Sequence, residues 1–158
     1  MWFEAHELER ILQKVIDNFL IPRFKDSGYI TKTMRATGEW EESLEIKISD
    51  DYGVIRGRDY SEQLAKGRAP GSMPPIRDLI RWAKAKFGVG EDEARRIAWS
   101  VGKKIEKLGT QYYIQGGTTL IEVLEEPKTI QFMQEELIAI ARVRVAENLQ
   151  RNAEKVFS

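Results

Sequence analysis

The stretch GRAPGSMPPIRDLIRWAKAKFG, residues 67–88, holds three of the five prolines of the chain and joins a loop to a helix. The prolines restrict the loop backbone, whereas Gly67 and Gly71 give it freedom, so we expect a loop of defined shape. Pro75 suits the first turn of a helix, and the apolar residues after it recur at helical spacing. The stretch therefore predicts a shaped loop over 67–75 and a helix that ends at its last glycine.

A second helix follows at once, over about residues 91–108. Acidic residues stand at its beginning and lysines near its end, an arrangement that suits the helix dipole. Its apolar residues form one stripe, and Gly109 ends it. We therefore expect two consecutive helices in the centre of the chain.

The N-terminal segment predicts an amphipathic helix from about Trp2 to Ile21. Its apolar side chains recur every three or four residues and form one stripe: Leu8, Ile11, Leu12, Val15, Ile16, Phe19 and Leu20. Pro22 has no N–H to donate and disfavours a helical residue before it, so we expect the helix to kink or end there. A turn over residues 25–28 follows.

Between this helix and the loop the pattern becomes extended. Leu44, Ile46 and Ile48 alternate with polar residues, which is typical of a half-buried strand. The turn 50–53 leads to a return strand toward Arg58, so the two segments predict a β-hairpin. A lone hairpin is marginal in water, and we expect it to pack on helices or to pair with other strands, including strands of another copy.

Two shorter elements complete the middle of the chain. Asp59 is a plausible N-cap for a short helix that runs to Lys66. The segments 112–114 and 120–123 flank a pair of glycines, and we expect them to form a second strand pair.

A helical pattern then runs from about residue 129 to 157, roughly 40 Å in length. The elements together predict an α+β fold: an N-terminal helix, a small antiparallel β-sheet built on hairpins, two central helices and a long C-terminal helix. We divide the chain into an α+β domain, 1–128, and a C-terminal helical extension, 129–158. We expect the extension to pack either on the same domain or on a neighbouring subunit.

The composition excludes several classes of protein. The chain has 158 residues, 42% of them hydrophobic, and its 25 Lys and Arg balance 25 Asp and Glu. It lacks cysteine, which excludes disulfides and thiolate sites. No apolar run is long enough for a membrane span, so we expect no membrane partner. The balanced charge argues against general electrostatic capture of nucleic acid.

We find no pattern that indicates catalysis. His6 is the only histidine, so neither a His-based triad nor a multi-His metal site can form within one chain. The paired acids, such as Glu41 and Glu42, lie beside turn residues rather than in an apolar setting that would shift a pKa. We therefore expect no enzyme activity, no cofactor and no metal site.

The four tryptophans divide into two groups. Trp82 and Trp99 lie on helix stripes or at their edges, and we expect them in the core. Trp2 and Trp40 lie at expected element ends and are candidates for contact surfaces, because aromatic side chains dominate interfaces.

Four basic residues gather around the return strand and the loop: Arg56, Arg58, Lys66 and Arg68. They would suit contact with the phosphates of DNA that passes through a channel. The alternative is that these residues form an ordinary solvated face or salt bridges to an acidic neighbouring copy. The zero net charge favours this alternative.

Residues 67–88, together with IAWSVGKKIEKLGT at 97–110, resemble the tail-completion or neck proteins of tailed bacteriophages, also described as minor tail or head-tail joining proteins. The matching features are the Gly-Arg-x-Pro loop, the Met-Pro-Pro that opens a helix with Trp82, and a second helix that ends in Gly-Thr. They cover about the middle third of the chain. Upstream, the N-terminal helix, a turn at Thr37 and Gly38, the hairpin and a segment with Tyr60 are also similar.

The resemblance implies a structural virion protein without enzymatic chemistry or cofactor. Such a subunit assembles as a ring, commonly six-fold with twelve-fold as the alternative, between the head connector on the portal side and the tail-tube proteins. It would surround the DNA channel, with non-specific contact to packaged DNA, and would assemble in the host cytoplasm. A tail terminator, a head-side adaptor and a small DNA-binding module that uses the 56–68 segment remain alternatives. The subunit interface would include the loop residues Gly67, Arg68, Pro70, Gly71, Met73, Pro74 and Pro75.

Overall fold

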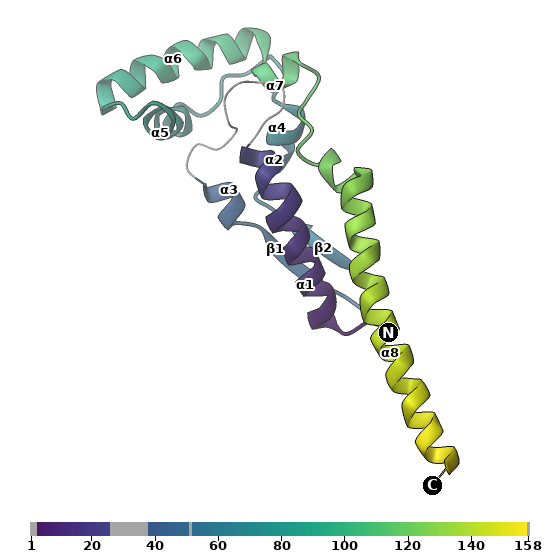
Figure 1. Ribbon diagram of the computed structural model, residues 1–158. Helices are drawn as coiled ribbons and strands as arrows, with labels where there is room; N and C mark the ends of the chain where they lie inside the picture. The colour runs from purple at the N-terminus through teal and green to yellow at the C-terminus, as the bar shows by residue number, and fades with distance from the viewer. Residues whose placement is uncertain (1–2, 26–37, 51, 158) are drawn as a thin grey trace.

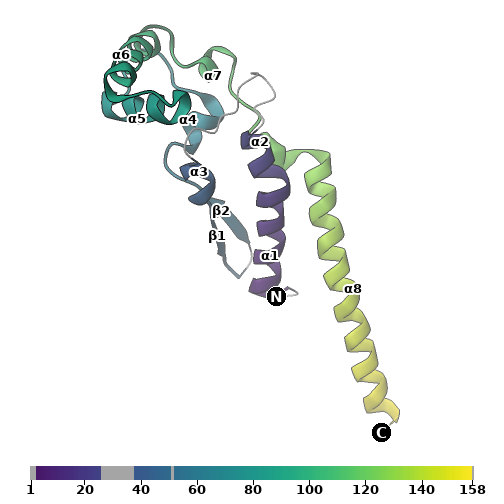
Figure 2. The same ribbon diagram turned by 60° about the vertical axis from the view of Figure 1, so that its left-hand side comes forward.

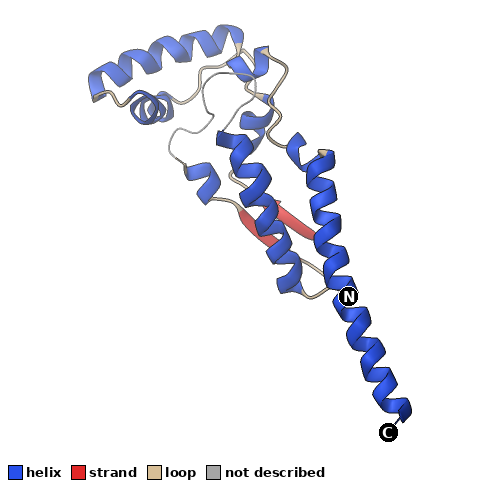
Figure 3. Ribbon diagram, viewed as in Figure 1, coloured by secondary structure: helices blue, strands red, loops and turns tan. Residues whose placement is uncertain are grey.

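The computed structural model describes residues 3–25, 38–50 and 52–157. It is mostly helical, 70%, with a small two-stranded antiparallel sheet and a long C-terminal helix, so the α+β prediction is confirmed. The molecule is elongated: the helices α5 and α6 lie at one end, and the tip of α8 lies at the other (Figure 1). Figure 3 shows how small the sheet is beside the helices. None of the described helices has the length and apolarity needed to cross a membrane.

The N-terminal helix, predicted to kink or end at Pro22, does not end there, but a π-helical turn interrupts it just before the proline. It consists of α1 (Ala5–Val15), one π-helical turn (Ile16–Leu20) and α2 (Ile21–Lys25). In the π turn the Ile21 N–H donates to the Ile16 carbonyl, five residues back. The wider turn makes room for the proline ring, which would otherwise meet a carbonyl of the preceding turn. Trp2 and residues 26–28 of the expected turn lie outside the described residues.

The predicted hairpin is confirmed. Strands β1 (Glu45–Ile48) and β2 (Gly53–Arg56) pair antiparallel, with Glu45 opposite Arg56 and Ile48 opposite Gly53. The hairpin packs on α1, which covers the apolar side chains that a lone hairpin would leave in water. The short helix α3 (Glu39–Glu42) precedes it. Thr37 and Asp51, which belong to two expected turns, lie outside the described residues.

The prediction of a second strand pair is wrong, because neither segment forms a strand. They form α7 (Gln111–Ile114) and a 3-10 turn (Glu122–Glu125). The Thr110 hydroxyl accepts a hydrogen bond from the Tyr113 N–H at 3.3 Å and caps α7. The Thr118 N–H donates to the Ala65 carbonyl at 2.6 Å, so this segment bonds to the end of α4 rather than to a strand.

The core lies where the π turn, α2 and α3 meet the segment that leads to α8. Its buried members are Ile16, Leu20, Phe24, Trp40, Leu120 and Val123. Trp40, expected at a contact surface, is only 3% exposed and packs on Phe24 with ring centroids 4.7 Å apart. Trp99, expected in the core, is 47% exposed, because it lies off the buried stripe of its helix.

The central helices form a helical hairpin at one end of the molecule (Figure 2). They are α5 (Ile76–Phe87) and α6 (Glu91–Leu108), and both agree with the sequence prediction. The short helix α4 (Ser61–Lys66) comes before the loop, and its N-cap position is taken by Tyr60 rather than by the predicted Asp59.

The C-terminal helix α8 (Pro127–Phe157) has 31 residues and a length of about 46 Å. Its first half packs along α1 and the π turn after it, where Phe132 meets Phe19 of the π turn at 5.3 Å between ring centroids. Lys14 of α1 forms an ion pair with Glu136 at 2.7 Å. Its second half projects beyond the rest of the chain (Figures 1 and 2).

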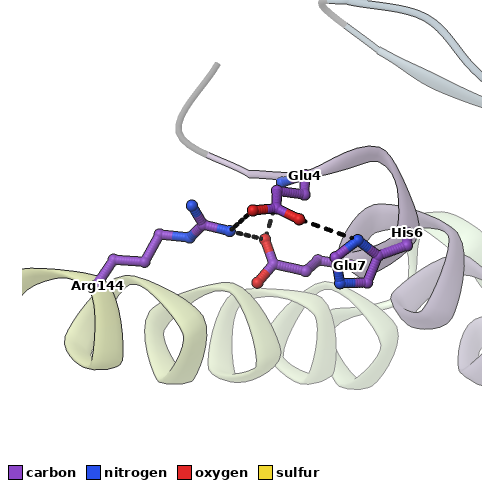
Figure 4. Close-up of polar contacts among 4 residues, drawn as sticks. All are labelled: Glu4, His6, Glu7 and Arg144. Atoms are coloured by element: carbon purple, nitrogen blue, oxygen red, sulfur yellow. Dashed lines mark hydrogen bonds and ion pairs between the residues drawn. The ribbon is translucent and has the colours of Figure 1, made fainter. Parts of the chain in front are cut away.

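A polar cluster holds the two helices together farther along α8 (Figure 4). The Arg144 guanidinium lies 2.6 Å from the Glu7 carboxylate and 3.4 Å from that of Glu4. The Glu4 N–H also donates to Glu7 at 2.8 Å. The pKa of Glu7 is therefore lowered, first by this backbone hydrogen bond and then by Arg144. His6 lies at the exposed edge of the cluster, 3.2 Å from Glu4.

We predict that acid loosens the contact between α1 and α8. Because the folded-state pKa of Glu7 lies below its ordinary value of 4.5, ionised Glu7 stabilises the fold above that value. This contribution is lost as the pH falls through the lowered pKa. The unfolding temperature of the wild type should fall more steeply with acid below about pH 4.5 than that of Glu7→Gln. Equal acid dependence in the two proteins would contradict the role of Glu7.

Candidate assembly surfaces

Hydrogen bonds to α6 and to the segment after it fix the loop 67–75. The Arg68 N–H donates to the Thr110 hydroxyl at 2.8 Å, and the Thr110 N–H donates back to the Arg68 carbonyl at 2.9 Å. The Gly71 N–H donates to the Glu106 carbonyl at 2.9 Å. The Gly71 bond satisfies a carbonyl of the last turn of α6, which would otherwise lack a helical partner. The loop is therefore part of the end of the helical hairpin.

Two glycines allow the loop to approach α7 closely. Gly67 has a φ of +78°, and a Cβ at this position would lie 2.6 Å from the Tyr113 Cα. Gly109 has a φ of +81°, and a Cβ there would lie 2.7 Å from the Arg68 carbonyl oxygen. Only glycine combines this backbone conformation with so close a contact.

The predicted interface residues do not share one orientation. Met73 packs inward on α6, where a Cβ at Gly102 would lie 2.8 Å from its sulfur. Pro70, Gly71 and Pro75 are exposed. Arg68 and Pro74 are partly buried and line a groove.

This groove, which we call the loop groove, has a volume of about 550 Å³ and lies between the loop, α5, α6 and α7. Its apolar lining comes from all four elements: Pro74, Leu79, Trp82, Phe87, Ile105, Tyr112 and Ile114. Burial raises the pKa of the Tyr112 hydroxyl, which stays protonated at neutral pH. The charged side chains in the lining are Arg68, Lys86 and Lys104, and the described lining contains no carboxylate. The loop groove therefore offers an apolar floor with a positive rim.

A second apolar surface runs along the outer half of α8. We call it the α8 stripe, and it consists of Ile138, Ala141, Val145, Leu149 and Val156. Ile138 is 50% exposed and Leu149 is 65% exposed. Residues spaced by three, four or seven lie on one side of a helix, so these side chains form a continuous apolar strip. Such a strip on a single chain marks a contact surface.

The four basic residues singled out in the sequence lie on separate elements. Arg56 and Arg58 are exposed on and after β2. Lys66 pairs with Glu62 on its own helix at 3.1 Å, and the Arg68 guanidinium donates to the Ser72 hydroxyl at 2.9 Å. Of the four, Arg68 lines the groove beside the loop.

The two surfaces suit the binding of another macromolecule. Each is open and several side chains long, and they lie toward opposite ends of the molecule (Figure 1). Within the described ranges, no three His, Cys, Asp or Glu side chains are placed to hold a metal ion. Comparison with known proteins finds no family model, no curated protein and no solved structure that matches the chain.

Proposed function

We propose that the chain is a non-enzymatic virion protein of a tailed bacteriophage. It acts as a ring-forming neck or tail-completion subunit that joins the head connector to the tail around the DNA channel. The resemblance of residues 67–110 to that family suggests the place of the ring. The observation that carries the assembly role is the pair of unlike apolar surfaces, the loop groove and the α8 stripe, toward opposite ends of one elongated chain.

Unlike surfaces at two ends favour a head-to-tail contact between copies. A contact between two different patches leaves one patch of each kind open, so further copies can add. The chain of copies closes into a ring when the rotation between neighbours divides a full turn. A six-fold ring is our first expectation and a twelve-fold ring the second. A tail terminator or a head-side adaptor would use the same geometry at another position in the particle.

The α8 stripe provides a direct test of self-association. Leu149 is largely exposed in the single chain, so a carboxylate in Leu149→Asp stays hydrated and should change stability by less than about 0.5 kcal/mol. In an assembled ring the same carboxylate would be buried against an apolar surface, which costs several kcal/mol. We expect the mass of the wild type in sedimentation velocity to rise with concentration, and Leu149→Asp to remain a monomer.

Asn148→Asp is the matched control, because it adds the same charge on an exposed position beside the stripe. It should associate as the wild type does. A wild type that stays monomeric at every concentration would contradict the proposal. Equal association of Leu149→Asp and Asn148→Asp would show that the α8 stripe is not the contact.

A further inference from the structure

The zero net charge of the chain is the sum of two unequal parts. The helical hairpin α5–α6, residues 76–108, carries nine Lys and Arg against five Asp and Glu, a net charge of +4. The other 125 residues carry a net charge of −4. The positive part lies at one end of the molecule, where it can approach a large partner without obstruction from the acidic remainder (Figure 1).

Four of these cations surround one open hollow on the helical hairpin, on a different set of residues from the loop groove. It has a volume of about 560 Å³, and we call it the basic face. Its lining consists of Ile76, Arg77, Ile80, Arg81, Lys84, Glu91, Arg95 and Trp99. Arg77 and Arg81 are one turn apart on α5, and Arg95 and Trp99 are one turn apart on α6, so each pair lies on one side of its helix.

The basic face carries more positive charge than the nearby carboxylates neutralise. Glu91 is the only carboxylate in the lining, and it pairs with Lys84 and lies 3.6 Å from Arg95. Lys84 lowers the pKa of Glu91, which is therefore ionised at neutral pH and contributes one negative charge. Arg81 lies 3.8 Å from Glu39, and Arg77 has no ion pair within the described part of the chain.

Trp99 adds an aromatic surface beside these cations. It is 47% exposed, although an indole of this size is usually buried in a single chain. Exposed aromatic side chains among Lys and Arg are the arrangement with which proteins hold nucleic acid strands, since bases stack on the ring while cations contact phosphates.

We propose that the basic face binds the phosphodiester backbone of DNA. Arg77, Arg81 and Arg95 contact phosphates, and the Trp99 indole stacks on a base where the strand is unpaired. Binding does not require the ring, since every residue comes from one chain. In a ring around a DNA channel, repeated copies of the face would strengthen a weak contact.

The test measures the binding of the purified chain to a labelled duplex and a single strand by fluorescence anisotropy. With about three phosphates neutralised, the duplex affinity should fall about 40-fold between about 50 mM and 200 mM salt. Arg77→Gln with Arg95→Gln should weaken binding to both DNAs at least tenfold and reduce the salt dependence. Trp99→Ala should weaken single-strand binding alone. Circular dichroism and thermal unfolding verify that each variant is folded.

Arg56→Gln with Arg58→Gln is the charge-matched control, and it should bind DNA as the wild type does. A larger loss in this control than in the Arg77 and Arg95 variant would overturn the proposal in favour of the β-hairpin. No binding at low salt would overturn it as well. Polyglutamate that competes as effectively as DNA would show an acidic protein partner instead. Self-association is measured separately. If the chain associates with itself but does not bind DNA, the DNA-binding proposal for the basic face is refuted and the proposed assembly role is not.

Discussion

Trp40→Ala is expected to lower the free energy of unfolding by about 4 kcal/mol, the largest effect of any single substitution considered. The indole is almost fully buried and packs on Phe24 with ring centroids 4.7 Å apart. Its Nε1–H donates to the Ser61 hydroxyl at 2.8 Å and so connects α3 to the first turn of α4. Alanine removes the packing and the hydrogen bond and leaves a cavity in the core.

Chemical denaturation of three variants separates these contributions. Trp40→Phe keeps an aromatic ring against Phe24 and should lose about 1–2 kcal/mol, mainly the hydrogen bond and part of the volume. Trp99→Ala removes the same side chain from an exposed position and should lose less than about 1 kcal/mol. Similar losses for Trp40→Ala and Trp99→Ala would contradict the assignment of Trp40 to the core.

Gly67→Ala is expected to lower the free energy of unfolding by about 3 kcal/mol. With φ +78° and ψ −179°, Gly67 lies in a backbone region that is essentially restricted to glycine and costs an alanine about 1–3 kcal/mol, and a Cβ at this position also collides with the backbone of Tyr113. The loop must then move away from α7, which breaks the hydrogen bonds between Arg68 and Thr110. Hydrogen exchange at the Gly71 and Thr110 amides should become faster as a result.

Gly88→Ala is the matched control for this substitution. Gly88 also has a positive φ, +65°, but its ψ of 28° places it in the ordinary left-handed region, which is less costly for an alanine, and a Cβ there meets no atom within 4 Å. It should lose only about 1–2 kcal/mol, and amide exchange in the loop should be unchanged. Equal losses at the two glycines would show that the close approach of the loop to α7 does not matter for stability.

The elements that the sequence predicts correctly have a local cause. The alternation of Ile46 and Ile48 predicts a strand, and helical spacing with a terminal glycine predicts α5 and α6. The strand prediction for 112–114 and 120–123 is wrong, because the conformation of this part of the chain depends on a threonine cap and on hydrogen bonds to α4, 53 and 54 residues away. Periodicity carries no information about partners so distant in sequence.

The candidate surfaces were less predictable than the elements. The basic residues that the sequence groups from Arg56 to Arg68 lie on separate elements, and Lys66 and Arg68 have contacts of their own. The basic face instead combines α5 with α6, and only the packing of the two helices brings Arg77 close to Trp99. The loop groove likewise needs α7, which the sequence did not predict. The α8 stripe was available from spacing alone.

The proposed place of this chain in a phage particle is tested most directly by imaging of the intact particle. Electron cryomicroscopy should show the chain as a closed ring at the junction of head and tail, six-fold or twelve-fold, with the α8 stripe of one copy covered by the next. The DNA channel should pass through the ring. A particle without density for this chain at the junction, or with isolated copies whose α8 stripe faces solvent, would contradict it.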